Sequence, residues 1–235
     1  MSDPIPHPGP AILFDLDGTL IDTLPDLVAA SNAFLAEHDA APLPQERVQA
    51  MIGDGLLALA AKVMAAGGIR PQEPIAVALQ ALRFRQIYEG LGHGLSTVYP
   101  HVRETLATLK ADGYRLALCT NKTEAMAQEM LVRFDLADLF ATVGGSDSFR
   151  ARKPDPAHVR GVLDRLGVSA GRAVMVGDSA NDVRAAQGAQ VRSVIVAYGY
   201  GLQGALAAGP EMVVARFADL PPVLARMLAP APSVT

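Results

Sequence analysis

The fold of this chain is decided by the stretch Phe14-Asp15-Leu16-Asp17-Gly18-Thr19-Leu20-Ile21-Asp22-Thr23. The apolar run Ala11–Phe14 that leads into it predicts a buried strand, and the two-residue alternation of a strand sends Asp15 and Asp17 to the same side where the strand ends. A lone Asp-x-Asp before glycine is most often only a turn. The pair therefore gains significance only if other acidic motifs accompany it.

A second acidic motif is Val174-Met175-Val176-Gly177-Asp178-Ser179-Ala180-Asn181-Asp182-Val183. It again predicts an apolar strand that delivers an acid to its carboxyl end. Ser179 is suited to cap the following helix, and Asp178 and Asp182, four residues apart, can converge near its start. Oxygen ligands without nearby cysteine or histidine favour a hard cation, and Mg²⁺ fits better than zinc. Asp182 alone could equally be a first-turn acid that suits the helix dipole.

Two further segments complete the candidate site. Leu116–Cys119 predicts a strand, and the residues that follow it, Thr120-Asn121-Lys122, precede a helix that Thr123 would cap, so a phosphate could bind there. In Lys153-Pro154-Asp155-Pro156, Pro154 favours an extended Lys153 while Asp155 caps the next helix. A cation placed beside carboxylates and a phosphate would offset their repulsion, although a solvated surface lysine is the simpler reading.

The order of the predicted elements indicates an α/β fold with a parallel sheet and right-handed crossovers. Ligands in such sheets bind outside the carboxyl ends of the strands, where Asp15, Thr120 and Asp178 fall. The predicted strands are Ala11–Asp15, Arg115–Cys119, Ala141–Gly144, Ala173–Gly177 and Arg192–Ala197.

The connection between the first two predicted strands is far longer than a crossover needs. Residues 23–93 show helical apolar spacing broken by glycine and proline, which predicts an inserted four-helix cap domain. Residues 1–22 and 94–235 would form the Rossmann-like core. Gly92-His93-Gly94 would be a flexible return point.

Composition sets limits on the class of protein. The chain has 235 residues, half of them hydrophobic, a net charge of −4 and one cysteine, Cys119. The hydrophobic content suits a packed core, and the single cysteine suits a reducing compartment. The charge shows neither the basic cluster of a nucleic-acid-binding surface nor that of a membrane-binding surface. Residues 1–10 lack the pattern of a secretion signal, and no apolar run approaches membrane-span length. We expect a cytoplasmic protein, monomeric or homodimeric, whose partner is a small molecule.

Taken together, the motifs D-L-D-G-T-L-x-D-T, Thr120-Asn121-Lys122, Lys153-Pro154 and G-D-S-x-N-D resemble the haloacid dehalogenase-like phosphatases. The resemblance covers the chain from Ala11 to about Leu228, with all four motifs in the family's order. It implies a Rossmann-like core, a helical cap over the site, and Mg²⁺-dependent hydrolysis of a small phosphorylated metabolite through an aspartyl-phosphate.

The resemblance also implies a role for each motif residue. Asp15 would be the nucleophile and a metal ligand, and Asp17 the general acid and base, with its backbone carbonyl on the metal. Asp178 would be the remaining metal ligand, and Asp182 would support the ligands without contacting the ion. The phosphoryl oxygens would be held by Thr120, Asn121 and Lys153, with Lys153 also contacting the nucleophile.

Substrate choice is expected to lie in the cap, where Gly53-Asp54-Gly55 joins two predicted helices. The flanking glycines could let backbone N–H groups face the substrate, but an ordinary interhelical turn is equally consistent. A negative Asp54 near an anionic substrate would need compensation. The candidates are Lys122, Arg47, Lys62 and Arg70, each of which we expect to be a solvated surface charge. The five dispersed histidines are assigned no chemistry.

Four other functions remain open at this point. The motif order does not separate a phosphatase for sugar phosphates or pyrophosphate from a phosphoglucomutase-type isomerase. A haloacid dehalogenase would need only the first aspartate, so Asp17 and Asp178 argue against it. A non-catalytic binding module would be expected to have lost at least one of Asp15, Asp17, Lys153 and Asp178, and all four are present.

Overall fold

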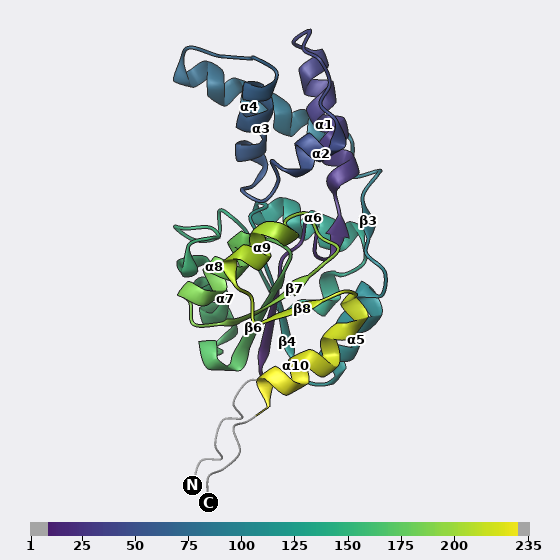
Figure 1. Ribbon diagram of the computed structural model, residues 1–235, viewed down its shortest axis with the longest axis vertical. Helices are drawn as coiled ribbons and strands as arrows, with labels where there is room; N and C mark the ends of the chain where they lie inside the picture. The colour runs from purple at the N-terminus through teal and green to yellow at the C-terminus, as the bar shows by residue number, and fades with distance from the viewer. Residues whose placement is uncertain (1–8, 230–235) are drawn as a thin grey trace, which may run out of the picture.

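The computed structural model describes residues 9–229, which form an α/β core and a helical unit joined by a two-stranded ribbon (Figure 1). What the sequence suggested for residues 1–8, including His7, and for residues 230–235 lies outside the described residues. Between Gly9 and Ala229 no helix is long and apolar enough to cross a membrane. The α/β class and the helical insertion predicted from the sequence are both confirmed.

The main sheet within the described residues has six strands in the order β5-β4-β1-β6-β7-β8, and every neighbouring pair is parallel. Five of the strands were predicted to within one residue. The edge strand β8 was not predicted, because a strand of three residues is too short to show the alternation of apolar and polar side chains. The bounds are β1 Ala11–Phe14, β4 Arg115–Cys119, β5 Thr142–Gly144, β6 Ala173–Gly177, β7 Arg192–Val196 and β8 Met212–Val214.

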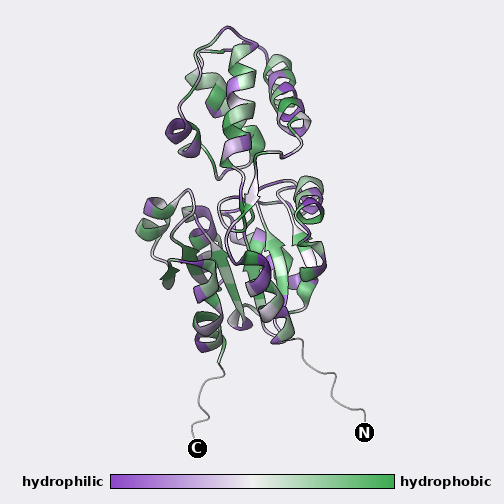
Figure 2. Ribbon diagram, turned by 90° about the vertical axis from the view of Figure 1, so that its right-hand side faces the viewer, coloured by the Kyte–Doolittle hydropathy of each residue, from purple (hydrophilic) through white to green (hydrophobic). Residues whose placement is uncertain are grey.

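Alternate residues of each strand pack on opposite faces of the sheet. In β1, Ile12 and Phe14 join one apolar cluster while Ala11 and Leu13 join the other. Figure 2 shows the apolar strands enclosed by helices of mixed polarity. The first face is covered by α5 (Val102–Ala111), α6 (Glu124–Arg133) and α10 (Leu220–Leu228), the second by α7 (Pro156–Leu166) and α8 (Ala180–Gly188), and α9 (Leu202–Ala208) packs on α8.

The strand register places the motif residues at one edge of the sheet. Phe14 is aligned with Leu118 on one side and with Val176 on the other. Because the three strands are parallel and end at nearly the same level, Asp15, Thr120 and Asp178 all emerge together. This convergence was predicted from the strand ends alone.

The helical unit is the predicted cap, and it has its own apolar core. Phe34, Phe84 and Tyr88 are fully buried there, and Met126 of α6 packs against the same cluster from the core side. We propose residues 23–93 as its limits. Its helices are α1 (Leu24–Ala36), α2 (Gln45–Gln49), α3 (Leu56–Ala66) and α4 (Pro74–Gly90), and the ribbon below it is β2 (Ile21–Asp22) paired with β3 (Thr97–Val98).

The segment that leads from the cap back to the core makes more contacts than its glycines predicted. The buried carboxylate of Asp26 accepts hydrogen bonds from the backbone N–H of Leu95 at 3.2 Å and from the hydroxyl of Ser96 at 2.5 Å. His93, predicted to lie in a flexible return, is buried against the ring of Tyr88. The crossing therefore consists of a hydrogen-bonded ribbon and a buried aspartate.

Replacing Phe14 with alanine is expected to lower the free energy of unfolding by about 3–5 kcal/mol. The ring is fully buried, and its centroid lies 6.2 Å from that of Phe140 and 5.8 Å from that of Phe217. Urea denaturation measures the change. Val132→Ala, at a side chain that is 69% exposed, is the control and should change the free energy by less than about 0.5 kcal/mol. Equal effects of the two substitutions would contradict this packing.

Candidate active site

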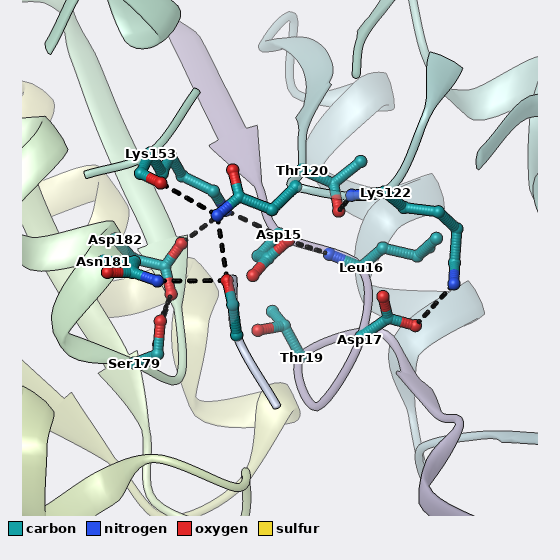
Figure 3. Close-up of polar contacts among 12 residues, drawn as sticks. Asp15, Leu16, Asp17, Thr19, Thr120, Lys122, Lys153, Ser179, Asn181 and Asp182 are labelled. Carbon is teal, nitrogen blue, oxygen red and sulfur yellow. Dashed lines mark hydrogen bonds and ion pairs between the residues drawn. The ribbon is translucent and has the colours of Figure 1, made fainter. Parts of the chain in front are cut away.

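The strand ends of the core and the inner side of the cap enclose a cavity of about 680 Å³. Asp15, Asp17, Thr120 and Asp178 line it from the core. Residues of α1, α2, α3 and the Gly53 loop line it from the cap. Figure 3 shows the core side chains turned toward one another around the end of β1. The cavity is the place where the predicted motif residues meet.

Asp15 is oriented by two contacts to one of its carboxylate oxygens. Oδ1 accepts the backbone N–H of Leu16 at 2.7 Å and lies 3.1 Å from the Lys153 ammonium. Within residues 9–229 no hydrogen bond engages Oδ2. Burial raises the pKa of Asp15 to about 6, although Lys153 opposes the shift. The side chain thus presents one unoccupied oxygen from a fixed position, as a nucleophile requires.

Lys153 is buried between two carboxylates, so the reading of it as a solvated lysine is excluded. Its Nζ lies 2.6 Å from Oδ1 of Asp182, and the Lys153 side chain is 1% exposed. The other oxygen of Asp182 accepts the N–H groups of Asp178 and Ser179 at 3.2 and 3.0 Å, and the Ser179 hydroxyl at 2.7 Å. Ser179 caps α8 as predicted, in a reciprocal capping box with Asp182.

The loop that carries Lys153 is held on both sides. The backbone N–H of Lys153 donates to Nδ1 of His158 at 3.2 Å, and the backbone carbonyl of Lys153 accepts from the Asn121 side chain at 2.9 Å. Asp155 caps α7 as predicted, accepting from Ala157 at 2.8 Å. Burial lowers the pKa of His158 to about 4, so the ring stays neutral and can accept. This positioning role of His158 gave no signal in the sequence.

Asp178, which follows β6, is held in place by residues of two other segments of the chain. Its carboxylate accepts the backbone N–H of Tyr200 at 2.7 Å and lies 3.4 Å from the hydroxyl of Thr19. Gly18 has φ +79°, and a Cβ there would lie 2.5 Å from the Asp178 side chain, so the predicted glycine turn is required. Burial, followed by repulsion from Asp182 and Asp15, raises the pKa of Asp178 well above its usual value.

Asp15, Asp178 and Asp182 form a cluster that could hold a metal ion. One carboxylate oxygen from each lies within 4.8 Å of the other two. In the described part of the chain, Lys153 is the ammonium that contacts this cluster, so three carboxylates face one positive charge. The oxygen-only donors fit a hard cation such as Mg²⁺. Oδ1 of Asp182 is bound by Lys153 at 2.6 Å and its Oδ2 accepts three hydrogen bonds. Oδ1 of Asp178 has only the 3.4 Å contact with Thr19, and Oδ2 of Asp15 accepts no hydrogen bond within residues 9–229, so Asp15 and Asp178 are better placed as ligands.

Asp17 is held on the cap side of the cavity. Its Oδ1 accepts the hydroxyl of Thr23 at 2.8 Å and lies 3.3 Å from Nζ of Lys122 (Figure 3). The expectation that Lys122 is a solvated surface charge was wrong, because its side chain is 4% exposed and also contacts the Tyr88 hydroxyl at 3.2 Å. The cap helix α4 covers it. In the sequence, the only indication that Lys122 lies at the site was its position two residues after Thr120.

The turn after β4 differs from its prediction at the helix start. Thr123 is the first boundary residue of α6, but its buried hydroxyl has no hydrogen-bond partner within residues 9–229. The N–H of Glu124 is instead capped by Asp147 at 2.8 Å. A cap from a residue distant in sequence cannot be read from the local pattern. Thr120 keeps its place at the site, where its oxygen accepts the N–H of Lys122 at 3.2 Å.

The Gly53-Asp54-Gly55 loop lies against the core motifs. The carbonyl of Gly53 accepts the side-chain amides of Asn121 at 2.9 Å and Asn181 at 3.0 Å. Asp54 pairs with Lys62 at 2.6 Å and with Asn181 at 3.0 Å, and these hydrogen bonds lower its pKa. Lys62 is thus a half-exposed ion-pair partner, while Arg47 and Arg70 are exposed as expected.

Tyr200 secures the ribbon where the cap begins. Its hydroxyl accepts the backbone N–H groups of Thr23 at 2.7 Å and Leu24 at 3.0 Å, and it donates to Asp22 at 2.8 Å. One tyrosine therefore satisfies two free donors at the start of α1. The run Tyr198-Gly199-Tyr200 was the only sequence signal for this contact.

The chain is similar in sequence and in structure to known proteins over most of its length. Residues 12–196 match the family model of the haloacid dehalogenase-like hydrolases. A phosphoglycolate phosphatase of Rhodospirillum rubrum is 43% identical over 89% of this chain and 88% of the relative, and one of Caulobacter vibrioides is 38% identical over 96% and 94%. The crystal structure of a predicted phosphoglycolate phosphatase from Haemophilus somnus aligns with a TM-score of 0.86 at 30% identity, over 92% of this chain and 97% of that one.

Replacing Asp182 with asparagine is expected to lower the free energy of unfolding by about 3–5 kcal/mol, because Lys153 loses its closer buried partner. Chemical denaturation measures the loss. Asp135→Asn is the matched control, since that carboxylate is 87% exposed in its pair with Arg103, and its change should stay below about 0.5 kcal/mol. If Asp182→Asn lowered the free energy of unfolding no more than the control does, Asp182 would not stabilise Lys153.

Proposed function

The chain belongs to the haloacid dehalogenase-like hydrolase family, and on this basis we propose that it hydrolyses 2-phosphoglycolate to glycolate and phosphate with Mg²⁺ bound. The observation that carries the proposal is the buried Lys153 ammonium beside the Asp15 carboxylate, at an edge where two further carboxylates converge. The names of the Rhodospirillum and Caulobacter relatives support the choice of substrate. The proposed activity suits a cytoplasmic protein, because its substrate is a small metabolite.

In the proposed reaction, Oδ2 of Asp15 attacks phosphorus and the ester bond breaks, which gives an aspartyl-phosphate. Asp17 donates a proton to the departing glycolate oxygen. It then takes a proton from the water that hydrolyses the aspartyl-phosphate. Lys153, the Thr120 hydroxyl and Asn121 stabilise the phosphoryl oxygens, where negative charge is held during both transfers.

Asp15, Asp178 and the backbone carbonyl of Asp17 would hold Mg²⁺. A bound Mg²⁺ would offset the charge of the carboxylates and of the substrate phosphate. Asp182 takes no direct part, since Lys153, Ser179 and the Asp178 N–H occupy its oxygens. Its role is to keep Lys153 and the Asp178 backbone in place.

Three runs of sequence resemble phosphoglycolate phosphatases in particular: Leu118–Lys122, Val143–Gly145 and Ala197–Tyr200. Asp54 stands where many of those enzymes carry asparagine. The geometry limits the effect of this change, because Lys62 and Asn181 already neutralise and bind the Asp54 carboxylate. A small acidic substrate therefore does not meet an uncompensated negative charge at this loop.

Removal of divalent cations is expected to abolish turnover. Three carboxylates and a phosphate place more negative charge together than Lys153 can offset. Phosphate release is measured before and after EDTA treatment, and again after Mg²⁺ is restored. Ca²⁺ should inhibit, because its larger and looser coordination disturbs the in-line geometry. Undiminished activity in excess EDTA would show that the proposed mechanism is wrong.

Asp15→Asn is expected to reduce kcat at least about a thousandfold, or ~4 kcal/mol in barrier, while the thermal midpoint changes little. Asp17→Asn should reduce kcat by about 10²–10⁴-fold. In the second variant the aspartyl-phosphate can still form, because its nucleophile is intact. Acid quenching with radiolabelled substrate distinguishes the two. Asp15 is not the nucleophile if Asp15→Asn keeps activity within about tenfold of the wild type.

Among phosphate esters, 2-phosphoglycolate is expected to give the highest kcat/KM. The panel should include pyrophosphate, glucose 6-phosphate and β-glucose 1-phosphate, the last assayed both for phosphate release and for glucose 6-phosphate formation. Isomerisation without net phosphate release would indicate a mutase. A hexose phosphate or pyrophosphate that exceeds phosphoglycolate by about tenfold, which is the discrimination a cap readily supplies, would replace the substrate and leave the phosphatase assignment intact.

A further inference from the structure

Lys122 is a buried cation that the proposed catalytic steps do not use. Its ammonium lies 3.3 Å from Oδ1 of Asp17 and 3.2 Å from the hydroxyl of Tyr88, and it sits over the Tyr88 ring at 5.0 Å from the centroid. Burial alone would lower the pKa of Lys122, but attraction to Asp17 outweighs it and the pKa is raised. The group is therefore a fixed positive charge at the wall of the cavity.

The position of Lys122 matches the shape of the proposed substrate. In 2-phosphoglycolate the carboxylate carbon is two covalent bonds from the ester oxygen. Asp17 must reach that oxygen to protonate it, and Lys122 is the cation adjacent to Asp17. A substrate whose phosphorus faces Asp15 thus brings its carboxylate into the neighbourhood of the Lys122 ammonium.

The other basic side chains near the cavity are already engaged or lie outside it. Among the described residues that line it, Lys122 is the one with a positive charge. Lys153 is held by Asp15 and Asp182. Lys62 pairs with Asp54, and Arg152 is exposed.

We propose that Lys122, held by Tyr88 of the cap helix α4, is the residue that recognises the substrate carboxylate. The inference rests on the proposed function, since it names the group that selects an acidic phosphate ester. When Asp17 turns to the ester oxygen, Lys122 would lose its carboxylate partner. The substrate carboxylate replaces it, so the buried charge stays paired only with an acidic substrate.

This exchange makes Lys122 a specificity-determining residue as well as a binding one. An ester without the carboxylate leaves a buried ammonium uncompensated, and sites of this kind discriminate strongly against an analogue that lacks the matching group. Tyr88 contributes by keeping the ammonium at the cavity wall. The discrimination therefore depends on a core residue and on a cap residue together.

The test compares 2-phosphoglycolate with ethyl phosphate, which has the same chain with a methyl group in place of the carboxylate. The discrimination ratio is kcat/KM for the first divided by kcat/KM for the second. Lys122→Met is expected to lower this ratio by about 100-fold or more, mainly through KM for phosphoglycolate. Lys122→Arg, which retains the charge, should lower it less than about tenfold. Lys110→Met, at an exposed lysine of α5 outside the cavity, is the matched control, with an expected change below about threefold. Lys62→Met, which leaves Asp54 without its ion-pair partner, should lower the ratio less than Lys122→Met does.

Three results would overturn the inference. Equal losses on both substrates in Lys122→Met would mean that Lys122 acts only through Asp17 or the fold. A larger fall of the ratio in Lys62→Met would transfer the role to the cap lysine. A wild-type ratio near one would reject phosphoglycolate as the substrate, and with it the inference. If Lys122→Met does not fold by circular dichroism, Lys122→Gln, a polar side chain without the charge, provides the same comparison.

Discussion

The buried ammonium of Lys153 is the interaction on which the rest of the site depends. A charge removed from water is tolerated only when its partners are close and fixed. Asp182 supplies the closest partner at 2.6 Å and Asp15 the second at 3.1 Å. His158 and Asn121 hold the backbone that carries the lysine. The positions of Asp15, the proposed nucleophile, and of the Lys153 ammonium are therefore set by one set of contacts.

The same edge of the sheet carries more negative charge than that lysine balances. Burial raises the pKa of Asp15 and of Asp178, which shows that both carboxylates are costly to keep ionised without further compensation. A cation held by these carboxylates would relieve this cost. The parallel strands concentrate the acids because β1, β4 and β6 end at one level. Natural proteins accept such local instability at functional sites.

Several polar contacts between the cap and the core lie around the cavity. The Gly53 carbonyl meets two asparagines of the core motifs, the Tyr200 hydroxyl binds the start of α1, and Tyr88 meets Lys122. Each contact joins a core segment that lines the cavity to a cap element. The position of the cap and the arrangement of the site are consequently coupled, in keeping with the proposed recognition of the substrate where the two units meet.

The sequence by itself determined the core architecture and the identity of the motif residues. Strand alternation, the Gly18 turn and the Ser179 and Asp155 caps are set by interactions within a few residues, so local patterns predict them. The tertiary structure alone showed that Lys122 is buried, that Asp147 replaces Thr123 as the α6 cap, and that His158 supports Lys153. These features were missed because each depends on partners distant in the chain. Burial and pairing of a side chain are decided by the segments that fold against it, and no local pattern contains them.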